Sequence, residues 1–300
     1  MPDYPEAHLN LGLCYLLVGD YENGWREYEW RKKLIKLPSD NLKKEWTGQS
    51  LDNKTLLILH EGNENLLHFI RFAKELHKDN CKIILQCSSA AMELMANQKW
   101  INEVVSEDTI PDHDYHVCIG SLTKVLQCNP NNLSQEYPYL VSKNNKVEST
   151  KKDKLNIGVV FETSRESNAH DDESIDKETI SNIFNDTHNV ICLDEKIAKE
   201  NLPTLYNDHF NYNDLGELSE FVSSLDLVIT VDHLVAHLAG ALNVNTFLML
   251  PCVPNWRWEI THRNTTPWYK SVTVFRQETP GDWKSVINKV KENLEENNHV

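Results

Sequence analysis

The residues with the clearest chemical potential are Asp232, His233 and His237, which follow the apolar run LDLVITV (225–231). That run predicts a buried strand, and the Ala/Leu-rich stretch after it predicts a helix. Asp232 stands where a helix N-cap is expected, and the two histidines are spaced to share one helix face. The N–H groups at such a helix start, beside the carboxyl end of a strand, form a site for an anion such as a phosphate.

A purely structural interpretation of the same segment stays open. Asp232 would then only cap the helix, and His237 would be a packed core histidine. Taken alone, the segment favours this interpretation. A zinc site is the weakest alternative, because the helix face offers no third ligand.

A second strand-to-helix turn, HEGNEN (60–65), follows the apolar run TLLIL. It carries a single glycine, Gly62, whereas phosphate-binding loops usually carry several. Glu61 and Glu64 carry carboxylates, the kind of group that can accept a proton as a general base. Asn65 has no group that could act as such a base.

Two arginines are candidates for contact with a phosphate. Arg257 lies between tryptophans in NWRWE (255–259), where it either stacks on a ring and fixes a loop or contacts a nucleotide. Arg165 is the only cation in FETSRESNAHDDES (161–174). The stretch DHDYH (112–116) contains pairs that could bind a metal, but such pairs are common by chance, so we interpret it as a polar turn leading into a strand.

The composition, with 40% apolar and 25% charged residues, is that of a globular protein. A net charge of −15 argues against nucleic acid or an anionic membrane as the main partner, and leaves room for a local basic pocket. No apolar run reaches the length of about eighteen residues that a membrane helix needs. The N-terminus shows no signal-peptide pattern, and the seven cysteines are scattered without a CxxC pair. We therefore expect a cytoplasmic protein with reduced thiols.

The first segment, residues 5–36, is predicted to form two helices that break at Gly19 and Asp20. Its glycines and tyrosines match the packing positions of a tetratricopeptide repeat. A single helix pair cannot bury its own apolar face, so it must pack on the rest of the chain, on a partner protein or on further repeats.

From Lys54 onward, short apolar strands alternate with helices, which predicts parallel α/β sheets of the doubly wound type. The polar stretch 142–154 is predicted to link two lobes, and the cleft between them is the expected ligand site. The expected strands are 55–60, 82–87, 115–119, 155–161, 189–194, 226–231, 245–250 and 272–276. The expected helices are 66–78, 89–97, 174–185, 215–224, 233–242 and 282–295.

A set of motifs carries a family resemblance: GDYENGWREYEWR (19–31), EWTGQSLDNKTLLILHEG (45–62), LDLVITVD…AHLAGAL (225–242), NWRWE (255–259), TPWYKSVTVFRQ (266–277) and GDW (281–283). With these motifs the chain resembles bacterial tetratricopeptide-repeat proteins that carry a glycosyltransferase family 9, heptosyltransferase-like domain. The resemblance implies a GT-B fold with two Rossmann-like lobes and a final helix that often crosses back to the first lobe. The implied segments are a helix pair (1–40), an acceptor-side lobe (41–145), a nucleotide-sugar lobe (155–282) and a C-terminal helix (283–300).

The resemblance also implies a donor site. The family's Asp and His of the strand-to-helix turn match Asp232 and His237, which would lie beside the diphosphate of a nucleotide sugar. His233 replaces the usual threonine of that turn. The implied transfer needs no metal ion and no cofactor other than the donor itself. The implied diphosphate site coincides with the anion site predicted from the residues, and this favours the functional interpretation of the turn.

Two other loops depart from the family pattern. When the chain is aligned on residues 69–71, Asn65 falls where the family's catalytic Asp belongs, and Glu64 replaces a glycine. Glu61 or Glu64 would then have to act as the base. In residues 161–174, Glu173 stands where an arginine is usual.

The sequence therefore predicts a glycosyltransferase that moves a sugar from a nucleotide donor to an unknown glycan or protein acceptor, with inversion. The alternative is a catalytically degenerate module that binds a nucleotide sugar or a protein, with the helix pair as a surface for a protein partner. An unrelated nucleotide-binding α/β protein is a third interpretation, which leaves the WREYEWR motif unexplained.

Overall fold

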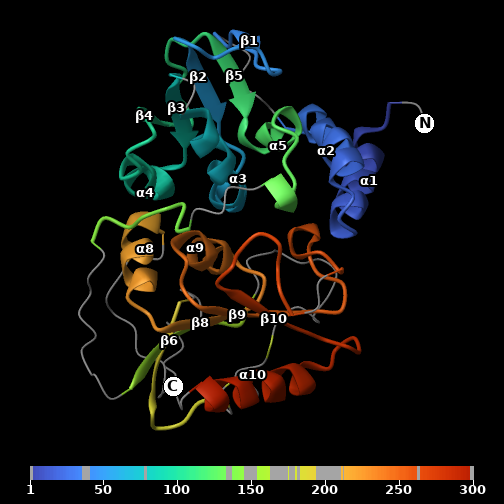
Figure 1. Ribbon diagram of the computed structural model, residues 1–300, viewed down its shortest axis with the longest axis vertical. Coiled ribbons are helices and arrows are strands. Elements are labelled where there is room, and N and C mark those ends of the chain that lie inside the picture. Colours follow the sequence, from blue (N-terminus) through green and yellow to red (C-terminus); the bar gives the residue numbers. More distant parts are fainter. Residues whose placement is uncertain are drawn as a thin grey trace. The chain divides into compact units, whose positions relative to one another are not determined.

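The chain divides into two compact units in the computed structural model (Figure 1). The first unit comprises Met1–Leu140 with Trp256–Thr261, and the second comprises Val141–Asn255 with His262–Val300. The structure describes residues 3–35, 41–77, 80–132, 137–144, 154–162, 175, 180, 183–193, 211, 213–261 and 264–297.

The first unit begins with the predicted helix pair, α1 (Pro5–Leu17) and α2 (Tyr21–Tyr28), which continues into the 3-10 helix η1 (Glu29–Lys33). The predicted break is confirmed: Gly19 has a φ of +80°, and the Asp20 side chain caps α2 by accepting from the Asn23 N–H at 3.2 Å. The helices lie side by side because Gly12 has no side chain; a Cβ there would lie 2.8 Å from the Tyr28 nitrogen. A helix pair is thus present, while its assignment as a tetratricopeptide repeat stays a prediction.

The first sheet has the strand order β1-β5-β2-β3-β4, and each neighbouring pair is parallel. Its strands are β1 (Lys44–Glu45), β2 (Thr55–Leu59), β3 (Lys82–Cys87), β4 (Glu103–Ser106) and β5 (Tyr115–Cys118). The helices of this part are α3 (Asn63–Leu76), α4 (Met92–Ala96) and α5 (Leu122–Val125), with the short 3-10 helices η3 (Ser89–Ala91), η4 (Ile119–Ser121) and η5 (Pro130–Asn132). The sequence predicted β2, β3 and β5 but missed the short edge strands β1 and β4.

The DHDYH stretch fixes the edge strand β1 to the sheet. The Lys43 N–H donates to Nε2 of His113 at 3.0 Å, and Nδ1 of His116 lies 2.8 Å from the Lys43 carbonyl oxygen. Both histidines therefore bond the backbone just before β1, in keeping with the polar turn that the sequence predicted.

The second sheet is also parallel, with the order β10-β9-β8-β6-β7. Its strands are β6 (Leu155–Val160), β7 (His188–Cys192), β8 (Leu227–Thr230), β9 (Thr246–Leu250) and β10 (Val272–Arg276). The helices α8 (Leu215–Ser223) and α9 (Leu234–Leu242) lie on one face and α10 (Trp283–Asn297) on the other (Figure 1). Most of the helix predicted at 174–185 lies outside the described residues. The doubly wound, parallel architecture of both units is confirmed.

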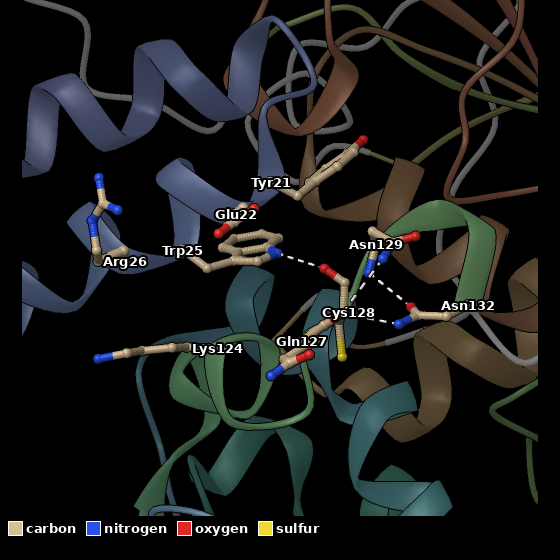
Figure 2. A pocket seen from close by; sticks show the side chains of 9 residues that line it. All are labelled: Tyr21, Glu22, Trp25, Arg26, Lys124, Gln127, Cys128, Asn129 and Asn132. Atoms are coloured by element: carbon tan, nitrogen blue, oxygen red, sulfur yellow. Dashed lines mark hydrogen bonds between the residues drawn. The ribbon is translucent and has the colours of Figure 1, made fainter.

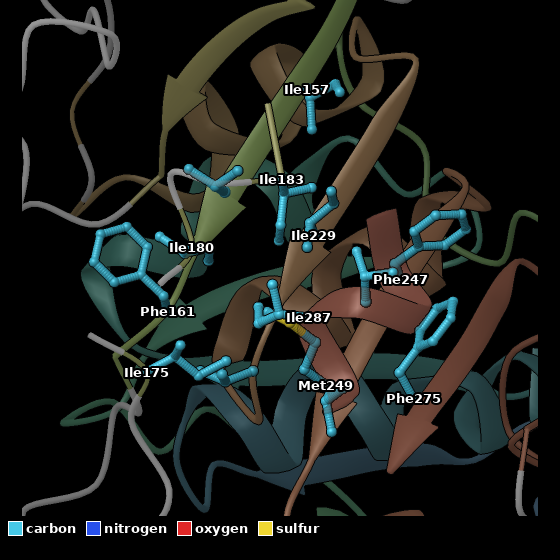
Figure 3. Packing of buried hydrophobic residues seen from close by; sticks show 14 of the residues in the cluster. Ile157, Phe161, Ile175, Ile180, Ile183, Ile229, Phe247, Met249, Phe275 and Ile287 are labelled. Carbon is cyan, nitrogen blue, oxygen red and sulfur yellow. The ribbon is translucent and has the colours of Figure 1, made fainter. Parts of the chain in front are cut away.

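The core of the second unit forms where alternate residues of the sheet meet α10, because successive side chains of a strand point to opposite faces (Figure 3). Ile229, Phe247 and Met249 come from the sheet, and Ile287 comes from the helix. The resemblance implies a final helix that often crosses to the first lobe; here α10 packs into the core of the second unit. Among the residues that the structure describes, no helix has the length and apolarity needed to cross a membrane.

Candidate functional site

The turn between β8 and α9 differs in one respect from its prediction. The N-cap of α9 is His233, not Asp232, since His233 has extended backbone angles and its Nδ1 accepts from the Val235 N–H at 3.2 Å. An N–H group can only donate, so Nδ1 of His233 must be unprotonated in this contact. The His233 carbonyl accepts from the Ala236 N–H at 2.9 Å. His233 therefore accepts hydrogen bonds from two N–H groups of the first helical turn. Asp232, which is half-buried, lies in the loop just before this turn.

His237 lies deeper in the second unit. It is 1% exposed, and its Nδ1 lies 2.7 Å from the hydroxyl oxygen of Tyr269, which is equally buried. The Tyr269 ring packs against Gly240, where a Cβ would lie 2.3 Å from the ring. These contacts are those of the packed core histidine that the sequence left open as an alternative.

The loop after β2 places the candidate bases of the first unit. Gly62 has a φ of +92°, a conformation that favours glycine, and it precedes α3. Glu64 is half-buried in the first turn of that helix, where a negative charge interacts favourably with the helix dipole. The single glycine of HEGNEN thus serves the backbone turn.

Glu61 forms a buried ion pair with Arg31 of η1. The Arg31 Nε and Nη2 donate to the two carboxylate oxygens at 2.8 Å and 2.9 Å, and the Gly120 N–H donates at 2.8 Å. The side chains of Arg31 and Glu61 are only 6% and 4% exposed. Burial by itself would lower the pKa of Arg31, but the charge of Glu61 overcomes this and raises that pKa above its usual range. Gly120 allows the pair to form, because a Cβ there would lie 2.8 Å from the Arg31 Nη2.

Asn65 bridges two segments of the first unit. Its Nδ2 donates to the Glu61 carbonyl oxygen at 2.7 Å, and its Oδ1 accepts from the Arg257 Nη2 at 2.5 Å. An aspartate could not donate to the Glu61 carbonyl, so the amide fits both contacts where a carboxylate would fit one. Asn65 is therefore built into the loop by the two bonds it makes.

Arg257 belongs to the first unit, although the sequence grouped it with the residues of the second lobe. Its guanidinium carbon lies 4.5 Å from the centre of the Trp256 ring. Trp256 in turn stacks on Phe69, with ring centres 6.1 Å apart, and the Ile260 N–H donates to the Leu17 carbonyl at 3.0 Å. These contacts match the interpretation in which Arg257 stacks and fixes a loop. Arg165 lies outside the described residues, as does Glu173.

No family model matches the chain, and no curated protein sequence matches it. Solved structures do match. A glycosyl transferase family 9 protein from Veillonella parvula gives a TM-score of 0.60 at 10% identity, covering 84% of this chain and 97% of that one. The ADP-heptose LPS heptosyltransferase II of E. coli gives a TM-score of 0.51 at 11% identity, and the match covers 81% of this chain and 99% of that one. The E. coli heptosyltransferase WaaC with ADP gives a TM-score of 0.50 at 13% identity, and the match covers 82% of this chain and 98% of that one.

The chain has the GT-B fold. This agrees with the two parallel α/β units described above, and it confirms the fold class that the sequence predicted. At such low identity the likeness concerns the fold, and one fold can serve many activities.

Arg31 and Tyr269 bond the candidate site residues Glu61 and His237, and neither contact was predicted from the sequence. Each lies inside a motif that carried the family resemblance, WREYEWR and TPWYKSVTVFRQ. The motifs therefore indicated that these two segments are structurally important. The sequence could not predict the contacts of Arg31 and Tyr269, because each side chain bonds a residue at least thirty positions away.

Proposed function

We propose that this chain binds a nucleotide sugar through the β8–α9 turn of its second unit and transfers the sugar to an acceptor. The observation that carries the proposal is the GT-B fold. Heptosyltransferases that share it have been solved with ADP, as for WaaC, and with ADP-D-beta-D-heptose, as for TibC. An ADP-linked sugar, with a heptose as the first candidate, is therefore the donor we propose.

Glycosyl transfer requires that the negative charge developing on the leaving diphosphate be stabilised. In our proposal the start of α9 supplies this stabilisation, through the imidazole of His233 and through N–H groups that exchange their bonds with His233 for bonds to the ligand. Asp232 precedes this helix start, and the buried His237 supports it from within α9. The family resemblance supports an inverting reaction that needs no metal ion. The position of these residues at the carboxyl end of β8 supports the assignment, because doubly wound sheets bind ligands at that edge.

The acceptor hydroxyl must lose a proton to a base. Of the two candidates, we propose Glu64 rather than Glu61. Accepting a proton on Glu61 would disrupt three hydrogen bonds from Arg31 and Gly120 and leave Arg31 with a neutral partner. Glu64 lies on the same loop, in the first turn of α3.

A second function is favoured by the contacts of the same loop. Glu61 and Asn65 are both held by structural bonds, so a binding module that retains the donor without transferring its sugar is the alternative. The exposed apolar side chains of Leu11 in α1 and of Val18 at its C-terminal end are the surface that a protein partner of such a module would contact. We place either function in the cytoplasm, a location that the seven free thiols support.

Calorimetric titration with ADP-, UDP-, GDP- and CMP-sugars tests the proposal. We expect an ADP-sugar to bind. We expect His233→Asn to weaken this binding by about tenfold, which corresponds to the loss of one good hydrogen bond. Asparagine keeps the helix cap but removes the imidazole. His77→Asn, at an exposed histidine of the first unit, is the matched control. Absence of binding by every donor would overturn the proposal.

Turnover separates the two functions. The transferase predicts that ADP is released from the bound donor when acceptor extracts are added, and that Glu64→Gln abolishes the release while Glu61→Gln acts mainly on stability. Donor binding without any release, unchanged by both substitutions, would favour the binding module.

A further inference from the structure

A pocket of about 600 Å³ opens in the first unit between α2 and the segment that follows α5 (Figure 2). One wall is formed by α2, with Tyr21, Glu22 and Trp25. The other wall is formed by Lys124, Gln127 and their neighbours up to Asn132. The residues of the candidate catalytic loop do not line this pocket, so it is a separate feature of the unit.

The back of the pocket is held by hydrogen bonds. Trp25 is 3% exposed, and its Nε1 donates to the Cys128 carbonyl oxygen at 2.7 Å, which ties α2 to the opposite wall. In that wall Gln127 has a φ of +52°, and its carbonyl accepts from the Asn132 Nδ2 at 2.9 Å. The Asn132 Oδ1 accepts from the Asn129 N–H at 2.8 Å, which closes the turn. A wall held in this way needs little further ordering when a ligand binds.

Three side chains at the mouth are available for a ligand. Glu22, Lys124 and Gln127 are exposed, and among the described residues their side chains make no hydrogen bond or ion pair. Together they offer an acceptor-only carboxylate, a donor-only ammonium group and an amide that does both. Arg26, which also lines the pocket, is 58% exposed, and its Nε donates to Glu27 at 3.3 Å, so part of its charge is already paired.

This mixture selects a class of ligand. A nucleic acid or other polyanion would need more cations than two and would meet Glu22. An apolar ligand would find little exposed aromatic surface, because Trp25 is covered. An extended peptide commonly binds along a free strand edge, and the walls here are a helix and a turn. Hydroxyl groups both donate and accept, so a molecule with several of them can satisfy the carboxylate, the ammonium group and the amide at once.

We propose that this pocket binds a saccharide. The proposal goes beyond sugar transfer, because it concerns a site formed by the helix pair and the α5 segment and needs no nucleotide. It also gives the helix pair a role that the sequence did not assign, as one wall of a carbohydrate site.

An oligosaccharide array, followed by calorimetric titration of the strongest binder without nucleotide, tests this proposal. We expect the double variant Lys124→Ala/Gln127→Ala to bind at least about tenfold more weakly, since it loses a charged and a neutral hydrogen bond. Glu22→Gln should weaken binding less, because an amide still accepts. The exposed Lys99→Ala is the control, and unchanged thermal melting confirms that each variant is folded.

The proposal is overturned if no oligosaccharide binds, if binding is equal in the double variant and the control, or if a peptide library yields binders where the array yields none. Because the titration contains no nucleotide, failure here leaves the donor titration of the second unit unaffected. Failure of the donor titration likewise leaves this site standing.

Discussion

The two strand-to-helix turns of this protein hold their polar residues in different ways. In the first unit, Glu61 and Asn65 are bound by arginines that lie 30 and 192 residues away in the sequence. In the second unit, His233 caps its own helix, two residues from the N–H group that it accepts from. The first turn is thus part of the packing of its whole unit, whereas the second is organised locally around the start of one helix.

This difference bears on function. A side chain held by a buried charge cannot easily change its protonation or its position, so the first loop is constrained by stability. A cap at a helix start can exchange its bond with an N–H group for a bond from a ligand with little effect on the rest of the fold. We therefore expect substitutions of Glu61 and Asn65 in the first loop to act mainly on stability, and substitutions of His233 in the second turn to act mainly on binding.

The largest effect should come from Arg31→Ala. It leaves the buried Glu61 carboxylate without its partner, and such a loss lowers the free energy of unfolding by about 3–5 kcal/mol. Urea denaturation measures this free energy. The control is Arg26→Ala, at a side chain that is 58% exposed, which should lower the free energy of unfolding by less than about 1 kcal/mol. Recovery of most of the stability in Arg31→Met/Glu61→Met would confirm that the unpaired charge is the cause, and equal effects of the two alanine variants would refute the buried pair.

A smaller loss is expected from Asn65→Ala. It removes the bonds to the Glu61 carbonyl and to Arg257, and we expect a destabilisation of about 2 kcal/mol because two buried polar groups lose a partner. Asn10→Ala on the exposed side of α1 is the control for the same chemical change. A variant as stable as that control would show that the bridge between the two segments is unimportant.

In the second unit, Tyr269→Phe should destabilise by about 1 kcal/mol, since it removes one buried hydroxyl from His237 without changing the packed ring. Tyr15→Phe on the half-buried side of α1 is the matched substitution. The comparison between the turns would have to be revised if Tyr269→Phe proved as damaging as Arg31→Ala.

The smallest effect concerns pH. Burial raises the pKa of Glu29, but Arg31 and Lys32 lower it by more, so in the folded protein it lies below its usual value. A carboxyl group with a lowered folded-state pKa contributes stability above its unfolded pKa, and this contribution is lost as the pH falls through the folded-state pKa. Urea denaturation between pH 7 and pH 3 should show Glu29→Gln losing less stability on acidification than the unsubstituted protein. If the free energy of unfolding fell equally with pH in both proteins, the ionised Glu29 would make no such contribution.

The sequence predicted the architecture well, because the pattern of short apolar strands between helices is local. It missed β1 and β4, which are two and four residues long and lack a fully buried side chain. It placed the cap on Asp232, the commoner residue type, whereas His233 adopts the capping backbone. It could not place Arg31 against Glu61 or Arg257 against Asn65, because contacts between distant segments leave no periodic signal.

The central claim is that the second turn binds the donor while the first turn is held by its own unit. Hydrogen–deuterium exchange with and without ADP-heptose tests this most directly. We predict slower exchange in peptides that cover residues 231–242 and no change in peptides that cover residues 60–65. Slowing confined to residues 60–65, or no change in either turn at saturating donor, would contradict the account.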